Sequence, residues 1–316
     1  MSIRKLIFGE GNRFSLVRSR KRVGLLLDSV NDNVGDKAIR IVMEEFLIEQ
    51  GVEFKVLNPF SFDHKDYRII IVGGGHLLRD PGDLFYDNFR VAGKHILNAV
   101  GVSTSKAVEY LNEYVYVSVR SKGDWQRIST LVKDIRIVPC PSVLMRGERC
   151  GVNVDRNSIG FHFHSASLAS CPDCASFINA FPNHSKYFMS FTPYNRDMET
   201  MRFISRRVPG SKTIFGKDPK HLFDIVGRIG FMVCSSLHAA IFAYMNRVPF
   251  IVFPYVEKVK EFMEDRGLEK WMFTSSQEMY LKLNDLMRER LDYSRLVEKD
   301  LEKARNHLQE IRAFLE

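Results

Sequence analysis

Residues 234–238 (CSSLH) end one apolar run and open a helical pattern, which gathers several polar groups at one point of the chain. A phosphate or a carboxylate would find the free backbone amides of a helix start there, with the hydroxyls of Ser235 and Ser236 and the imidazole of His238. The alternative is structural, with Ser236 capping the helix and His238 packing at a domain surface. Lys258 follows the next apolar run, where a lysine either holds an anion or is simply solvated.

Two glycine-containing loops form a second group of candidates. The loop 31–36 follows the first apolar run and leads into a helical pattern, and its Gly35 allows the backbone to approach a ligand closely. Alternatively, Asn33 or Asp36 only caps the helix. Glycines 73–75 end a buried strand at a cost of about 0.5–1 kcal/mol each relative to alanine, so we expect a ligand or a helix to approach them closely.

His162 and His164 lie two apart in a predicted strand, and Cys171 and Cys174 form a CxxC pair soon after. By ligand count these four side chains could form a tetrahedral zinc site, but only one CxxC pair is present and histidines in a cleft serve equally well as ligand contacts. We therefore predict no metal. HExxH and GxSxG motifs and a paired-carboxylate spacing are absent from the sequence. The odd total of five cysteines indicates reduced thiols.

Strand and helix patterns alternate along the chain and predict a parallel sheet in each half. In the first half, apolar runs lie at 22–28, 53–59, 67–75, 114–120 and 135–141. In the second half, SIGFHFH, KYFMSFTP, SKTIFG, GFMVCSS and VPFIVFP are typical of strands. Strands separated by helices imply right-handed crossovers. We therefore predict an α/β fold of two doubly wound sheets that face each other across a cleft, with ligands outside the carboxyl ends of the strands.

The domain boundaries follow from shifts in composition. We expect a basic N-terminal arm at 1–21, a first domain at 22–150, a second domain at 151–275 and C-terminal helices at 276–316. The turn-rich stretch RGERCGVNVDRNS separates the two strand series. A length of 316 residues is sufficient for two hydrophobic cores.

The formal charge of +8 is concentrated at one end of the chain, because residues 1–22 hold seven basic side chains and one acidic one. A basic stripe with interleaved aromatic residues is absent, which argues against a nucleic-acid partner. The arm is either a solvated terminus or a peripheral contact with an anionic bilayer or a polyanionic substrate. No apolar run approaches the roughly 18 residues of a membrane span, so we expect a cytoplasmic protein, or one peripheral at the inner face of the membrane.

Four segments in series resemble the polysaccharide pyruvyl transferase family: 33–39 (NVGDKAI), 69–80 (IIIVGGGHLLRD), 117–121 (VSVRS) and 235–262 (SSLHAAIFAYMNRVPFIVFPYVEKVKEF). The last is the most specific, since it combines SLH, a helix, VP, an apolar strand and YxxK. The resemblance implies a GT-B-like architecture of two Rossmann-type domains. It also implies that phosphoenolpyruvate is the co-substrate, that no cofactor is used, and that a sugar of a cell-surface polysaccharide or lipid-linked glycan receives the pyruvate unit as a ketal.

The resemblance also implies roles for individual residues, with the acceptor on the first domain and the donor on the second. Arg120 makes a bidentate contact with an anion, and His238 contacts the phosphate or donates a proton as the enol carbon becomes a methyl group. His164 is a weaker acid or base candidate. The other positions are Ser235, Ser236 and Lys258 in the donor pocket, and Asn33, Gly35, Asp36, Gly73, Gly74, Gly75 and His76 in the loops on the acceptor side. Side chains and the helix terminus supply the positive potential, so no metal is needed.

Two other functions are alternatives. One is a GT-B nucleotide-sugar glycosyltransferase, for which no acidic residue is clearly placed to bind ribose hydroxyls. The other is a non-catalytic glycan-binding descendant of the family, favoured by Ser236 where many members have arginine and opposed by Arg120, His238 and Lys258. C-terminal segments of GT-B-like folds tend to cross back over the first domain, so residues 276–316 either do this or mediate assembly.

Overall fold

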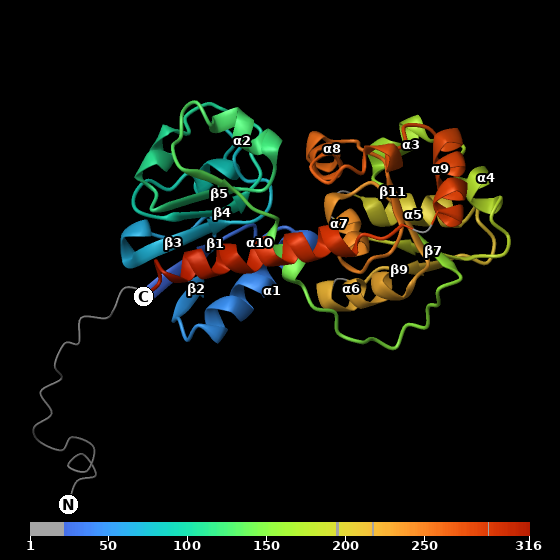
Figure 1. The fold of residues 1–316 in the computed structure, drawn as a ribbon, viewed down its shortest axis with the longest axis horizontal. Helices are drawn as coiled ribbons and strands as arrows, with labels where there is room; N and C mark the ends of the chain where they lie inside the picture. Colours follow the sequence, from blue (N-terminus) through green and yellow to red (C-terminus); the bar gives the residue numbers. More distant parts are fainter. Residues whose placement is uncertain (1–21, 194–195, 217, 290) are drawn as a thin grey trace, which may run out of the picture.

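The computed structural model describes residues 22–193, 196–216, 218–289 and 291–316. The basic arm, and with it the expected contact with a bilayer or a polyanion, lies outside the described residues. Two parallel sheets form two α/β lobes that lie side by side, and the last helix runs across both (Figure 1). The chain therefore has the two doubly wound sheets that its sequence predicts.

The first sheet has six parallel strands in the order β2-β1-β3-β4-β5-β6. Its strands are β1 (Arg22–Leu26), β2 (Phe54–Val56), β3 (Tyr67–Gly73), β4 (Ile96–Val100), β5 (Tyr116–Val119) and β6 (Ile135–Ile137). The helical elements of this lobe are α1 (Val34–Glu49), α2 (Lys122–Ile128) and the 3-10 turns His64–Asp66, Tyr86–Phe89, Glu109–Glu113 and Pro141–Leu144. Alternate residues of β1 and β3 pack into two cores, one on each face of the sheet, as both faces of a parallel sheet require.

The second sheet has five parallel strands in the order β11-β10-β7-β8-β9. Its strands are β7 (Ser158–His162), β8 (Ser185–Met189), β9 (Lys212–Ile214), β10 (Phe231–Cys234) and β11 (Phe250–Val252). The helices are α3 (Ser165–Ser170), α4 (Cys174–Asn179), α5 (Asp197–Ser205), α6 (Pro219–Arg228), α7 (Leu237–Met245), α8 (Glu257–Glu264), α9 (Ser276–Arg288) and α10 (Ser294–Arg312), with a 3-10 turn at Glu269–Trp271. Four of these five strands lie within the predicted segments, and β8 begins one residue before its segment, at Ser185.

Each sheet has one point at which the strand order reverses. In the first sheet the chain runs from β1 outward to β2 and then returns to β3 on the other side of β1. In the second sheet it runs from β7 outward through β8 and β9 and then returns to β10 beside β7. Ligands of open α/β sheets bind at these reversals, beyond the carboxyl ends of the strands. The loops after β1, β3, β7 and β10 are therefore the expected ligand-binding loops.

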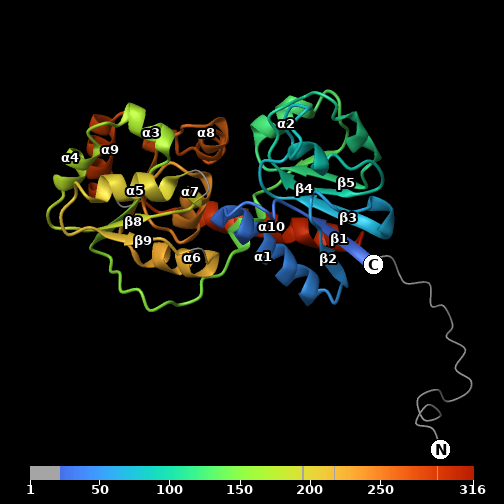
Figure 2. The same ribbon diagram turned by 180° about the vertical axis from the view of Figure 1, so that it is seen from behind.

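Helix α10 returns from the second lobe to the first. Asp300 contacts Tyr244 and Arg266 in the second lobe, while His307 lies 2.9 Å from the Tyr116 hydroxyl and donates to Asn98 Oδ1 over 2.7 Å in the first. Of the two alternatives for the C-terminal helices, the structure shows the crossing. The view from behind places α1 beside α6 (Figure 2), where Glu45 and Lys220 form an ion pair of 2.7 Å between the lobes.

Candidate active site

The loops at the two strand-order reversals meet between the lobes. The loop after β1 is fixed to the second lobe, because the Val34 N–H donates to the Phe191 carbonyl over 3.0 Å. The first turn of α1 in turn contacts the first turn of α7, which follows β10. The predicted site residues on these loops are thus brought together from both halves of the sequence.

His238 lies in the first turn of α7 and is 9% exposed. Its ring presses against α1, since a Cβ built on Gly35 would lie 1.7 Å from its Nδ1. Only glycine can occupy this position without displacing the imidazole. On the other side, His238 Nε2 lies 3.9 Å from the Cys140 Sγ. The imidazole therefore bridges the two lobes rather than packing at the surface of one.

Arg120 follows β5 directly, and its side chain is 6% exposed. Its guanidinium donates to His76 Nδ1 over 2.9 Å and lies 3.6 Å from the Asp124 carboxylate. Gly101 leaves room for it, since a Cβ there would lie 2.0 Å from Arg120 Nη2. Asp124 is itself fixed by the Val102 N–H over 2.7 Å, so Arg120 is held in one orientation.

Lys258 enters the same cluster from the first turn of α8. It lines a small pocket of about 20 Å³ together with Arg120 and Cys140. It also lines an open hollow of about 270 Å³, to which His76, Arg79 and Arg127 contribute. Lys258 therefore lies between a buried pocket and the solvent-accessible space between the lobes.

The charged groups of this cluster shift one another's pKa values. Burial, followed by repulsion from Arg120, lowers the pKa of Lys258 to about 8. Burial, followed by repulsion from Asp28, raises the pKa of Asp36 to about 7 against the attraction of Lys258, Arg120 and Arg79. Strongly shifted groups of this kind are typical of functional sites. A carboxyl and an amine that titrate near neutral pH are suited to exchange protons with a substrate.

The two histidines of the cluster are neutral in the empty site. Burial, then the charges of Lys258 and Arg120, lowers the pKa of His238 to about 3. Burial, then the charge of Arg120, lowers the pKa of His76 to about 2, consistent with its Nδ1 accepting from Arg120. Both imidazoles stay neutral because burial, and after it the surrounding cations, disfavour the imidazolium. A bound anion would reduce this repulsion and raise both pKa values.

The glycines at the end of β3 are approached closely by other parts of the protein. A Cβ on Gly73 would lie 2.5 Å from Asn98 of β4, and one on Gly74 would lie 2.1 Å from Ile39 of α1. Gly75 (φ +77°) lies against Asp36, whose Oδ1 would be 2.9 Å from a Cβ there. Of the two predicted causes of close approach, helix and strand packing accounts for Gly73 and Gly74.

Three other loop candidates also have structural partners. Asn33 caps α1, because its side chain accepts the Gly35 N–H over 2.8 Å. Ser236 caps α7 by accepting the Ala239 N–H over 3.2 Å, as the structural alternative predicts. Ser235 accepts the His164 N–H over 2.6 Å. These three side chains shape the loops, whereas Asp36, in the first turn of α1, is the group there whose pKa is shifted toward neutrality.

His164 lies at the margin of the cluster. Its ring stacks on Tyr255 with 4.4 Å between centroids and caps α3 through Nδ1, which accepts the Ala166 N–H over 3.2 Å. Burial, followed by repulsion from His162, lowers its pKa. It therefore forms part of the wall of the site rather than its centre.

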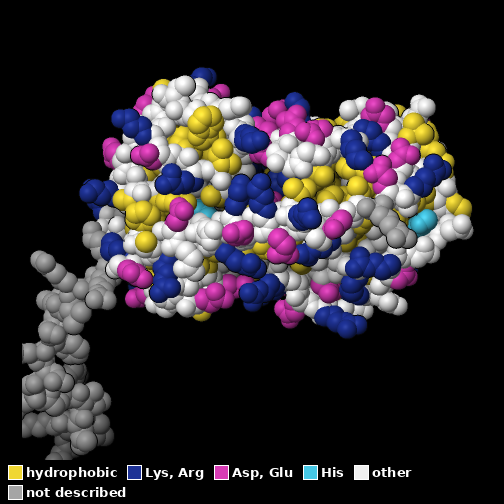
Figure 3. Space-filling model, in the orientation of Figure 1, with side chains coloured by type: hydrophobic (Ala, Val, Ile, Leu, Met, Phe, Trp, Pro, Cys, Tyr) yellow, Lys and Arg dark blue, Asp and Glu magenta, His cyan; other side chains and the backbone are white. Residues whose placement is uncertain are grey.

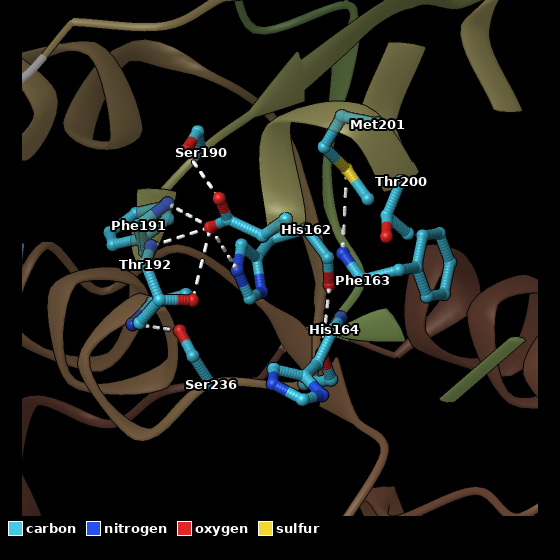
Figure 4. Close-up of polar contacts among 12 residues, drawn as sticks. His162, Phe163, His164, Ser190, Phe191, Thr192, Thr200, Met201 and Ser236 are labelled. Carbon is cyan, nitrogen blue, oxygen red and sulfur yellow. Dashed lines mark hydrogen bonds and ion pairs between the residues drawn. The ribbon is translucent and has the colours of Figure 1, made fainter. Parts of the chain in front are cut away.

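A second polar cluster is centred on Asp197, and Figure 4 shows its partners Ser190, Phe191, Thr192 and His162. The Asp197 carboxylate accepts hydrogen bonds from Ser190 Oγ (2.6 Å), the Phe191 N–H (2.7 Å), Thr192 and His162 Nε2 (3.2 Å). Burial alone would raise the pKa of Asp197, but the bonds and charge of His162 and the other donors outweigh it and hold the pKa well below its usual range. The cluster fixes the loop after β8, whose Phe191 carbonyl holds α1.

The structure does not gather the four side chains of the zinc alternative. His162 donates to Asp197 and His164 stacks on Tyr255, while Cys171 and Cys174 are buried. Burial raises the pKa of Cys174 to about 11, which disfavours the thiolate that zinc needs. Among the described residues, no group of three or more His, Cys, Asp or Glu side chains is placed to hold a metal ion.

Three further residues of the cluster are not among the predicted site residues, although one of them, Arg79, lies in the segment 69–80 that resembles the family. Arg79, three residues beyond His76, has its guanidinium 3.8 Å from the centroid of the Tyr86 ring. Within the described part of the chain, no carboxylate lies within ion-pair distance of it. Cys140 and Asp124 complete the surroundings of His238 and Arg120. Only the position of Arg79 just after a candidate loop could have suggested it.

The comparison with protein families identifies the chain. A family model described as polysaccharide pyruvyl transferase matches residues 33–256, well over half of the sequence. The chain belongs to the polysaccharide pyruvyl transferase family. The match includes every predicted site residue except Lys258, which lies two positions beyond its end. A comparison with curated protein sequences found no significant match.

Solved structures place the pyruvyl transferase fold with the GT-B glycosyltransferases and epimerases. A Listeria monocytogenes protein described as a UDP-N-acetylglucosamine 2-epimerase has a TM-score of 0.62 at 12% identity, with 94% of this chain and 97% of that one covered. The S. aureus MnaA–UDP complex has a TM-score of 0.55 at 13% identity (90% and 91% covered). Arabidopsis thaliana UGT89C1 with quercetin has a TM-score of 0.52 at 11% identity (93% and 99% covered). At these identities the similarity concerns the fold, and it confirms the expected GT-B-like architecture.

The family match gives the chain a transferase class and polysaccharide modification as its setting. In the described residues, no helix is both long enough and apolar enough to span a bilayer. The pyruvyl transferase motifs of the two lobes, NVGD and SLH, are in direct contact through Gly35 and His238. The family sequence pattern therefore corresponds to one physical site.

Proposed function

We propose that this chain transfers the enolpyruvyl unit of phosphoenolpyruvate to a sugar, as a pyruvate ketal. The observation that carries the proposal is the cluster of Arg79, Arg120 and Lys258 around the neutral imidazoles of His76 and His238. Arg79, Arg120 and Lys258 converge where the loops of both strand-order reversals meet. A ligand with a phosphate and a carboxylate has enough acceptor oxygens to bind all three cations.

Arg120 and Lys258 are the anion-binding residues in this proposal. The Arg120 guanidinium is held by Asp124 and His76, so it offers a fixed fork of donors to a phosphate or a carboxylate. Lys258 adds an ammonium whose pKa is only slightly above neutrality and rises when an anion binds. The start of α7, with its partial positive charge, favours the same ligand.

The transfer needs one proton added to C3 of the donor and one removed from each reacting hydroxyl. The first hydroxyl oxygen bonds to C2 while C3 takes a proton and becomes a methyl group. The bond between C2 and the phosphate oxygen then breaks, phosphate leaves, and the second hydroxyl oxygen closes the ketal. Asp36, whose pKa is about 7, accepts the two hydroxyl protons in turn; the first balances the proton given to C3, and the second leaves with the phosphate as hydrogen phosphate. His238 donates to C3 once the bound dianion has raised its pKa.

The acceptor sugar binds in the hollow of about 270 Å³ beside Lys258. The wall of this hollow includes Arg79 and Ser103 from the first lobe and Glu257 from the second, which together offer both donors and acceptors for hydroxyl groups. Five of its lining residues, His76, Arg79, Val102, Ser103 and Arg127, come from the first lobe, which favours an acceptor on the side of the first domain. A cell-surface polysaccharide or its lipid-linked precursor is the expected acceptor class.

The proposal is tested by release of phosphate from phosphoenolpyruvate in the presence of candidate glycans. Wild type should release phosphate only when donor and acceptor are both present, and His238→Ala should release none while melting at the wild-type temperature. Binding of a UDP- or GDP-sugar without binding of phosphoenolpyruvate would contradict the proposal and indicate a glycosyltransferase. Binding of glycan alone would indicate the non-catalytic alternative.

A further inference from the structure

Glu261 of α8 crosses the gap between the lobes and binds at the start of α2. Its carboxylate is 7% exposed, accepts the Ser121 hydroxyl over 2.7 Å and pairs with Arg127. Ser121 is the residue that caps α2, because its Oγ also accepts the Asp124 N–H over 2.9 Å. A carboxylate of the second lobe is thus part of a helix cap in the first.

The start of α2 is shaped to receive this carboxylate. A Cβ on Gly123 would lie 2.1 Å from Glu261 Oε1, so glycine is required for the carboxylate to fit. One turn further along α8, Asp265 accepts the Lys122 N–H over 3.1 Å. Two negative groups at a helix N-terminus interact favourably with its partial positive charge. Acidic side chains gather between the lobes beside α8 in the space-filling view (Figure 3).

This contact holds the site in a closed form. The pocket between Arg120, Cys140 and Lys258 has a volume of about 20 Å³, enough for about one water molecule. Ser121 of the first lobe and Phe262 of α8 also line it, so the contact between α8 and the start of α2 limits its size. A donor that carries both a phosphate and a carboxylate cannot bind there unless α8 moves away from β5 and α2.

We propose that Glu261 is an interdomain latch that opens to admit the donor and closes again to bring Lys258 to Arg120. Lys258 lies three residues before Glu261 on α8, and Arg120 directly precedes Ser121, so the latch joins the two chain segments that carry the donor-binding cations. Glu261 is therefore a positioning residue. The inference rests on the proposed function for the identity of the ligand, but the latch itself is a property of the empty protein.

A latch predicts a kinetic signature that a merely structural ion pair does not. The same contact is present before and after the donor binds, so weakening it destabilises both closed states equally. The association and dissociation rates of phosphoenolpyruvate should then rise together, while the dissociation constant stays nearly unchanged. A structural defect would instead weaken binding or lower the melting temperature.

The experiment compares Glu261→Gln with Glu264→Gln on the same helix. Glu264 pairs with Lys260 within α8 and is the matched control for the loss of one negative charge. In the ligand-free full-length protein, we expect amide hydrogen exchange in 121–128 to accelerate on the order of tenfold in Glu261→Gln, because a hydrogen bond to a charged group is lost. The control should exchange like wild type. Equal exchange in the two variants would overturn the latch.

Stopped-flow binding of phosphoenolpyruvate then tests the gating role, and Ser121→Ala provides a second route to the same effect. Both rates should increase about tenfold in Glu261→Gln and less in Ser121→Ala. Unchanged rates despite faster exchange would show that the contact does not control access. If wild type binds no phosphoenolpyruvate, the proposed function fails, while the exchange comparison still decides whether the latch exists.

Discussion

Two buried polar clusters lie at the carboxyl ends of strands in this molecule, and they differ in how their charges are balanced. Asp197 is surrounded by hydrogen-bond donors that satisfy it, so its pKa lies far below neutrality and its charge is fixed. Arg120 and Lys258, by contrast, are buried like charges that repel each other, and the pKa values of Asp36 and Lys258 move toward neutrality. The first arrangement stabilises loops, and the second is prepared for an anionic ligand.

The comparison separates stability from function. A satisfied buried carboxylate is costly to disturb, since removing it leaves several donors without a partner. A cluster of buried cations that repel each other costs stability in the empty protein and is useful only when a ligand completes it. Variants in the two clusters should therefore affect different measurements.

The largest expected effect is on turnover in Arg120→Ala. The loss of a fixed guanidinium should lower kcat/KM for phosphoenolpyruvate on the order of 10³-fold, because the charge that develops on the phosphate is no longer stabilised. Steady-state phosphate release measures it. Arg136→Ala, which removes an exposed arginine paired with Glu310, is the control and should keep wild-type turnover. A similar loss of kcat/KM in both variants would contradict a specific role for Arg120 in stabilising the phosphate.

The second-largest expected effect is a loss of stability in Asp197→Asn. The N–H groups of Phe191 and Thr192 then donate to a neutral amide oxygen, which is a weaker acceptor, and His162 no longer bonds to a charged carboxylate. The free energy of unfolding should therefore fall by about 3 kcal/mol. Chemical denaturation at pH 7 measures the change. An Asp197→Asn variant as stable as wild type would contradict the claim that the Asp197 cluster stabilises the fold.

The affinity for phosphoenolpyruvate should depend on pH through Lys258. Burial and Arg120 lower the pKa of this ammonium to about 8 in the empty site, so its charge is present below that pH and lost above it. The dissociation constant should rise toward a limiting slope of about tenfold per pH unit above pH 8. Lys258→Met should bind weakly at every pH and lose this dependence. The same slope in the variant would assign the titration to another group.

The smallest expected effect is a gain in stability in Lys258→Met. Below pH 8 the folded protein holds a charged amine whose pKa is lower than in the unfolded chain, which costs stability, and methionine removes that cost. The free energy of unfolding should increase by about 1 kcal/mol at pH 7 and converge with that of wild type toward pH 10. A loss of stability would mean that Lys258 contributes to the fold.

Most of the fold could be predicted from short apolar runs, because strands buried on both faces leave a continuous signal. The sequence pattern does not predict strand β4 (Ile96–Val100), because the polar Asn98 interrupts its short apolar run. In the structure the strand is also irregular, with Ala99 at a φ of 50°. Asn98 is there to receive His307 from α10, a contact 209 residues away in sequence. No local pattern indicates a partner so far along the chain.

The site shows the same limit. Arg120, His238 and Lys258 lie in motifs, and the structure brings them together. Ser235, Ser236 and Asn33 match the same motifs but bond to the backbone, and the sequence could not separate these two groups. Glu261 has no signal in the sequence because its role depends on a helix of the other lobe.

Calorimetric titration with phosphoenolpyruvate tests the central claim most directly, since it requires no knowledge of the acceptor. Wild type and Arg136→Ala should bind with the same affinity, and Arg120→Ala should bind at least a hundredfold more weakly with an unchanged melting temperature. Binding of the same strength in all three proteins would contradict the claim that the cluster between the lobes is the donor site.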